Sequence, residues 1–247
     1  MNKFLKVICL ILAICSLAVV FGSCDEENKP IDDKAFYDYN SSDTGKGADI
    51  RTKFVEREIN SMSVQDFVAS EKESDYILIK VKDYGDIVVV LRPDVAPKSV
   101  ANFKKLVSEN FYSGTIFHRI IEDFMIQGGG LTSIDSEDGT SSTIVQKETS
   151  ASVVGEFDSN GFENKLYHVR GVISMARATD KNSATSQFFI VHKTSAHLNG
   201  EYASFGYVLA GMDVVDKIAA CDEFLEEGST MPLNNIVIES ITFVEPK

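Results

Sequence analysis

The stretches TIFHRIIEDFMIQGG at 115–129 and SQFFIV at 186–191 hold the most informative residues of this chain. Each stretch combines large apolar side chains with polar ones. Together the two stretches contain one arginine and two glutamines. This set offers fixed hydrogen-bond donors and an apolar surface, but no activated nucleophile. It suits the binding and twisting of an uncharged group better than the breaking of a covalent bond.

The chain around these stretches is typical of a mainly β domain. Two β-rich runs at 76–82 and 86–92 flank Asp-Tyr-Gly, which is a hairpin signal. Pro97 opens one helical stretch, and a second helix fits 211–220. Many short strands with only two helices predict a closed antiparallel β-barrel of about eight strands, capped by the helices. The other expected strands are 115–120, 124–127, 171–176, 186–192, 204–209 and 235–244.

The segment that follows the first stretch has a different composition. Residues 130–165 are rich in Ser, Thr, Asp and Gly, which predicts an irregular loop. Gly128, Gly129 and Gly130 lead into it and predict a tight turn. No Lys-Ser/Thr pair follows these glycines, so a phosphate-binding loop is not indicated.

Composition excludes several classes of partner. The 247 residues carry a net charge of −13 with no basic stripe, so phosphate backbones repel the chain and nucleic acid is excluded. The four histidines share no ligand spacing, so we expect neither a metal site nor another cofactor.

The N-terminus is typical of an export signal. Lys3 and Lys6 precede an apolar run that ends at Phe21, and Cys24 follows Gly-Ser. This order resembles the lipobox of bacterial lipoproteins, which implies that Cys24 is lipidated and that the mature protein is anchored to a membrane of the cell envelope. An uncleaved membrane anchor is the alternative. Acidic residues at 25–27 resemble surface-export signals of some lipoproteins, although inner-membrane retention or simple solubility would also fit.

These signals divide the chain into four parts. Residues 1–23 are expected to be the signal peptide and 24–48 a flexible acidic tether. Residues 49–74 predict a short amphipathic helical extension, with Ser63 and Asp66 as a capping pair. The folded domain is expected at 75–247.

Six motifs together resemble cyclophilin-type peptidyl-prolyl cis-trans isomerases, in the order and spacing of that family. The resemblance spans about 76–245 and implies an enzyme that speeds rotation about X–Pro bonds. The motifs are FHRII (117–121), FMIQGG (124–129), GVISMAR (171–177), SQFFI (186–190), HLNGEYASFGYV (197–208) and GMDVVDKI (211–218).

The resemblance also implies roles for single residues. Arg119 would stabilise the twisted amide, and Gln127 would orient Arg119 or bond the substrate carbonyl. Phe188 is assigned to the core, because it points away from Phe189 along one strand. The proline pocket would consist of Phe124, Met125, Phe189 and Leu198. The remaining substrate contacts would be His118, Ala176, Arg177 (through its backbone), Gln187, His197 and Tyr202.

The implied partners are proline-containing unfolded or flexible polypeptides. Because the family often has tryptophan where this chain has His197, we expect only weak binding of the drug cyclosporin. The alternative function is a non-catalytic binding module or chaperone that recognises proline segments on the same fold. A hydrolase that uses His118 lacks a credible nucleophile.

Overall fold

The computed structural model describes residues 53–135, 142–147, 149 and 151–247. The expected signal peptide at 1–23, the tether at 24–48 and the lipidated Cys24 lie outside the described residues. Within the described part, no helix is long and apolar enough to span a bilayer.

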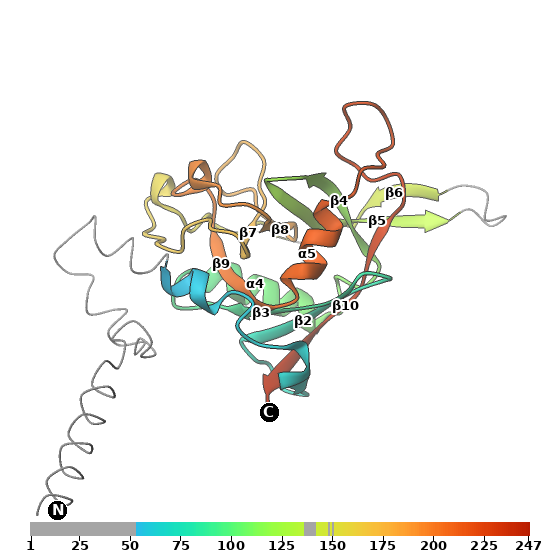
Figure 1. Cartoon of the computed structure of the whole chain (residues 1–247). Helices are drawn as coiled ribbons and strands as arrows, with labels where there is room; N and C mark the ends of the chain where they lie inside the picture. Colours follow the sequence, from blue (N-terminus) through green and yellow to red (C-terminus); the bar gives the residue numbers. More distant parts are fainter. Residues whose placement is uncertain (1–52, 136–141, 148, 150) are drawn as a thin grey trace, which may run out of the picture. The chain divides into compact units, whose positions relative to one another are not determined.

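Eight antiparallel strands close into a barrel (Figure 1), as the strand pattern predicts. Pairing runs β10-β2-β3-β9-β7-β8-β5-β4, and β4 pairs with β10 to complete the circuit. Two further strands add to its edges, β1 (Phe67–Ala69) on β10 and β6 (Ser142–Gln146) on β5. The barrel strands are β2 (Tyr76–Val81), β3 (Gly85–Leu91), β4 (Thr115–Ile121), β5 (Met125–Asp135), β7 (Val172–Met175), β8 (Phe188–Val191), β9 (Ser204–Ala210) and β10 (Ile236–Pro246).

Two helices cover the barrel, α4 (Pro97–Ser108) and α5 (Met212–Ala219). α4 contacts β9 and β10, and α5 contacts β3, β4 and β5. α4 touches two strands that are separated in the circuit, and α5 touches β3 on one side and the β4–β5 pair on the other, so each helix spans an end of the barrel. Phe103 of α4 and Ile218 of α5 are fully buried in one core that is continuous with the barrel interior. The prediction of a capped barrel is therefore confirmed.

The N-terminus of α4 is capped from a distant loop. The residue at the cap position is Ala96, which has no side-chain acceptor. Instead, the buried carboxylate of Glu156 accepts hydrogen bonds from the backbone N–H groups of Lys98 (2.9 Å) and Ser99 (2.8 Å). A negative charge at the N-terminus also interacts favourably with the positive end of the helix dipole. This contact fixes the loop around 153–166 against the barrel.

The prediction of an irregular loop at 130–165 is wrong at its start. β5 continues to Asp135 and pairs with β6, forming a hairpin that projects beside the barrel in Figure 1. The three glycines at 128–130 do not form a turn but lie within β5. A Cβ on Gly129 would stand 2.7 Å from the ring of Phe188, so glycine is needed there for close packing.

The extension before the barrel is only partly helical. Residues 53–58 form a helical turn, and a 3-10 turn follows at η2 (Val64–Asp66). Ser63 N–H donates to the Asp66 carboxylate at 2.8 Å, which confirms the capping pair. The chain then enters β1 instead of a second helix, because pairing with the end of β10 overrides local helix propensity.

Candidate active site

A row of three side chains crosses the outer face of the barrel. Arg119 of β4 is directly opposite Gln127 of β5, and Gln127 is opposite Phe189 of β8. Cross-strand partners project to the same face of a sheet, so the strand pairing alone brings these three side chains together.

A β-bulge turns Arg119 outward. Strict alternation along β4 would place residue 119 on the same face as Phe117, whose side chain is fully buried in the core. The register shifts between Phe117 and Arg119, and His118 has no cross-strand partner. As a result, Phe117 and Ile120 both point inward, and Arg119 faces the outer surface.

The row forms the floor of a small cavity of about 110 Å³. Drug-sized ligands need roughly 300–1,000 Å³, so this space suits one small ring. Nine of the twelve residues expected at the site line it, and they come from five different segments of the chain. These nine are Arg119, Phe124, Met125, Gln127, Ala176, Arg177, Phe189, Leu198 and Tyr202.

Hydrogen bonds hold the polar side of the cavity in one geometry. Arg119 Nη1 donates to Gln127 Oε1 at 3.3 Å and also lies 3.8 Å from the sulfur of Met125. Gln127 Nε2 in turn donates to Gln187 Oε1 at 2.9 Å. Both Arg119 contacts use a single nitrogen of a guanidinium that has five N–H donors. Its other nitrogens are not used in these two contacts.

The apolar side of the cavity rests on a buried histidine that the sequence patterns did not single out. The ring of His168 stacks on Phe189 with centroids 5.9 Å apart and planes 17° apart. His168 bonds Ser174 at 3.0 Å and Asn199 at 3.2 Å. Burial lowers the pKa of His168 to about 4, so the ring is neutral at pH 7.

Tyr202 forms the opposite wall and is itself held from behind. Its ring meets Phe189 edge-on at 5.8 Å, and the Arg177 guanidinium lies 4.6 Å from its centroid. Arg177 Nε and Nη2 donate to the carbonyl of Glu201 at 3.1 and 3.0 Å. The Arg177 side chain is thus bound to the protein, and the expected role of its backbone stays a prediction.

Three expected site residues do not line the cavity. Gln187 lies behind it and accepts the hydrogen bond from Gln127, and His197 is exposed with its ring 5.4 Å from that of Phe124. His118 is half-buried at the bulge, and its Nδ1 is buried without a hydrogen-bond partner among the described residues. Burial lowers the pKa of His118, which disfavours a charged ring.

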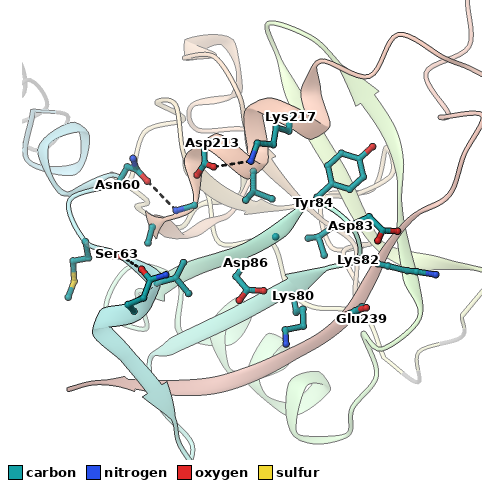
Figure 2. Close-up of a pocket in the computed structure, with 18 residues that line it drawn as sticks. Asn60, Ser63, Lys80, Lys82, Asp83, Tyr84, Asp86, Asp213, Lys217 and Glu239 are labelled. Carbon is teal, nitrogen blue, oxygen red and sulfur yellow. Dashed lines mark hydrogen bonds and ion pairs between the residues drawn. The ribbon is translucent and has the colours of Figure 1, made fainter.

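A larger groove of about 840 Å³ lies elsewhere, between the extension and the β2–β3 hairpin (Figure 2). Its charged residues include Lys80, Lys82 and Asp86, and Lys217 pairs with Asp213 at 3.2 Å. Such an open mixture of exposed charges provides neither an apolar pocket nor a fixed donor. None of the described residues of the extension, 53–70, lines the cavity at Arg119.

Comparison with known proteins agrees with the geometry. Residues 76–243 match the family model described as cyclophilin type peptidyl-prolyl cis-trans isomerase/CLD. A protein of Brucella suis named probable peptidyl-prolyl cis-trans isomerase is 40% identical over 181 residues, covering 72% of this chain and 88% of that protein. Peptidyl-prolyl cis-trans isomerase B of Escherichia coli is 39% identical, with 66% and 96% covered.

Solved structures give the same fold. The crystal structure of a cyclophilin-type peptidyl-prolyl cis-trans isomerase from Cryptosporidium parvum superposes with a TM-score of 0.55 at 29% identity, covering 70% of this chain and 98% of that one. A second structure of that protein, determined in the presence of the dipeptide Ala-Pro, gives a TM-score of 0.53 at 30% identity, with 68% and 98% covered.

Proposed function

The chain belongs to the cyclophilin-type peptidyl-prolyl cis-trans isomerase family, and we propose that it catalyses X–Pro rotation in the cavity lined by Arg119. The activity follows from the family, whereas the place and the mechanism are our proposal. The observation that carries it is the Arg119 guanidinium, which is fixed by Gln127 beside the apolar wall of Phe189.

The reaction needs no nucleophile. Resonance opposes rotation about a peptide bond with a barrier of about 18–20 kcal/mol. Unaided X–Pro bonds therefore exchange in roughly tens to hundreds of seconds. A catalyst must hold the proline ring, leave the preceding carbonyl free to swing, and bind the twisted amide more tightly than the planar one.

Arg119 is suited to that differential binding. When the amide twists, its nitrogen loses conjugation and regains a lone pair that accepts a hydrogen bond. A guanidinium never deprotonates near neutral pH and keeps its donors in a rigid plane. Gln127 holds Nη1, so in our proposal another nitrogen of Arg119 donates to the proline nitrogen. Because the donor is fixed beforehand, little reorganisation is needed as the amide twists.

The apolar residues hold the ring and strengthen this bond. Phe189 and Leu198 are almost fully buried, and Met125 closes the floor. A proline ring against these side chains displaces water, and electrostatic interactions strengthen as the local dielectric constant falls. Ala176 is small, so in our proposal the substrate backbone passes over it. The solved relative in the presence of Ala-Pro supports a proline dipeptide as the minimal ligand.

Exchange kinetics on a short Ala-Pro peptide test this assignment. Arg119→Ala should lower kcat/KM by about 100-fold, the loss that follows removal of one fixed donor in a polar transition state. The matched control is Lys82→Ala, which removes a cation from the groove and should leave kcat/KM unchanged. Equal values for Arg119→Ala and the unmodified protein would refute the proposed mechanism.

We further propose that the enzyme is exported and held to the envelope by lipid on Cys24, where it assists the folding of exported proteins. The basic start, the apolar run and the position of Cys24 after Gly-Ser support this proposal. Cys24→Ala should abolish incorporation of labelled fatty acid and release the protein from the membrane fraction, and continued labelling would contradict the anchor.

A further inference from the structure

The wall residue Phe124 lies in an unusual turn. It is the last residue of the connection between β4 and β5, and its N–H donates to the carbonyl of Ile121 at 3.1 Å. Asp123, just before it, has a φ of 59°, in the left-handed region that non-glycine residues rarely adopt. A turn that contains such a residue needs outside contacts to stay in one conformation.

His192, the first residue after β8, supplies those contacts. Its backbone N–H donates to the carbonyl of Phe124 at 2.9 Å, and the N–H of Lys193 reaches the same oxygen at 3.3 Å. The Nδ1 atom of the His192 ring accepts a hydrogen bond from the N–H of Asp123 at 3.1 Å. Backbone and side chain of one residue therefore hold both Asp123 and Phe124.

The other edge of the His192 ring faces a carboxylate on α5. Because Nδ1 accepts, the ring proton of the neutral form is on Nε2, which lies 3.3 Å from Oδ1 of Asp216. Arg170 fixes that carboxylate, with Nη2 donating to Oδ2 at 2.8 Å and Nη1 at 2.7 Å from Oδ1 as an ion pair. The Arg170 hydrogen bond lowers the pKa of Asp216. Arg170 Nη1 also donates to the carbonyl of His192 at 2.9 Å.

We propose that His192 is a positioning residue for the isomerase reaction, which ties the Phe124 turn to Asp216 and Arg170 and thereby fixes one wall of the proline cavity. This inference rests on the proposed function, since it assumes that Phe124 contacts the proline ring. Arg119 and Gln127 are held separately from the Phe124 turn, by strand pairing and by their own hydrogen bond. Losing the ring contact should therefore weaken substrate binding more than it slows the chemical step.

Two substitutions at this position test the Nδ1 contact and the Nε2 contact of His192 separately. In His192→Asn, the side-chain oxygen occupies the place of Nδ1 and can still accept from Asp123 N–H, although the contact with Asp216 is lost. In His192→Gln, the amide reaches the place of Nε2 near Asp216, but no acceptor remains for Asp123. Lys193→Ala is the control, because it removes only a surface ion pair with the Asp123 carboxylate at 3.1 Å.

The measurements are KM and kcat on an Ala-Pro peptide and the hydrogen exchange of the Asp123 amide, all with the full-length protein. His192→Gln should raise KM about five-fold, the factor for one ordinary hydrogen bond, with kcat little changed and Asp123 exchange faster. His192→Asn should restore most of the original KM and most of the slow exchange of the Asp123 amide. Lys193→Ala should behave as the unmodified protein.

Two results would overturn the inference. One is faster Asp123 exchange in His192→Gln with unchanged KM, which would show that the turn does not shape the cavity. The other is an equal KM for the Asn and Gln variants, which would show that the Nδ1 contact is not what positions the turn. Absence of isomerase activity in the unmodified protein would instead contradict the proposed function.

Discussion

The cavity at Arg119 and the groove in Figure 2 differ in more than volume. The cavity is about 110 Å³ and the groove about 840 Å³, yet the smaller one places a half-buried guanidinium, bonded to Gln127, beside buried apolar side chains. Its floor is built on the neighbouring strands β4, β5 and β8 of a closed barrel. A ligand there meets donors whose positions are already determined, which is what transition-state binding requires.

The charged side chains of the groove have little fixed geometry. Lys80 and Lys82 are exposed, and the pair between Lys217 and Asp213 links two exposed side chains. Such pairs contribute little, because solvent screens them and the long side chains lose entropy when held. Under the proposed function, preorganisation and burial matter more for catalysis than the size of a hollow or its number of charges.

The largest expected difference between the two regions is their response to exchange of arginine and lysine. Arg119→Lys keeps the charge but loses the planar set of donors, so kcat/KM should fall about 100-fold. The reverse exchange in the groove, Lys80→Arg, should leave kcat/KM unchanged. A full-strength Arg119→Lys enzyme would show that charge alone suffices, which would contradict the role given to the guanidinium geometry.

Acid should lower the stability of the protein through His168, whose ring packs against Phe189 at the cavity. The folded pKa of His168 is about 4, below the usual value near 6.5, so its contribution to stability is complete above pH 6.5 and is lost as the pH falls toward 4. Between pH 7.5 and pH 5 this one group should reduce the free energy of unfolding by ~2 kcal/mol. Urea titrations at both pH values measure the loss.

His168→Gln is the control for that measurement, because glutamine keeps polar atoms near Ser174 and Asn199 but does not titrate. The variant should show a smaller fall in stability over the same pH interval, since the other titrating groups are unchanged. An equal fall in both proteins would mean that His168 is not the group responsible.

Removing the partner of Arg119 should have a smaller effect than removing Arg119. Gln127→Ala frees Nη1 and also breaks the bond to Gln187, so the guanidinium samples more orientations and kcat/KM should fall about ten-fold. Gln65→Ala removes a glutamine that lines the groove and should change nothing. Steady-state kinetics of both variants measure this difference. Equal kcat/KM for Gln127→Ala and the unmodified protein would argue against orientation of Arg119 by Gln127.

The smallest expected effect concerns stability on the groove side. Asn60 Oδ1 accepts hydrogen bonds from the N–H groups of Gly211 (3.1 Å) and Met212 (3.2 Å) and so caps α5 from the extension. Asn60→Ala should lower the free energy of unfolding by about 1 kcal/mol, as for other lost helix caps, and leave kcat/KM intact. A marked loss of activity would indicate that the extension influences the cavity after all.

The sequence predicts the barrel well because its signals are local. Short β-rich runs predict all eight barrel strands, and Pro97 marks the start of α4. β5 is underestimated, since its glycine-rich part has no alternating pattern and its extension depends on pairing with β6 and with the start of β4. The extension is likewise drawn into β1 by pairing with β10, a long-range contact that local propensity does not contain.

The site follows from the motifs, but its geometry does not. Strict alternation would place Arg119 on the core face of β4, and only the bulge at His118 turns it outward. His168 lies about twenty residues from Phe189 in sequence, and no spacing rule connects the two rings. The place of His192 beside the Phe124 turn depends on strand pairing and on α5 together. It therefore could not be predicted from the sequence motifs either.

The most direct test compares catalysis with ground-state binding in Arg119→Ala. The kcat at saturating Ala-Pro peptide and the Kd of that peptide should be measured on the same protein. If the guanidinium acts on the twisted amide, kcat falls about 100-fold while Kd changes less than about three-fold. A variant that binds the peptide about 100-fold more weakly but turns it over at the original kcat would contradict the account, because Arg119 would then only bind the substrate.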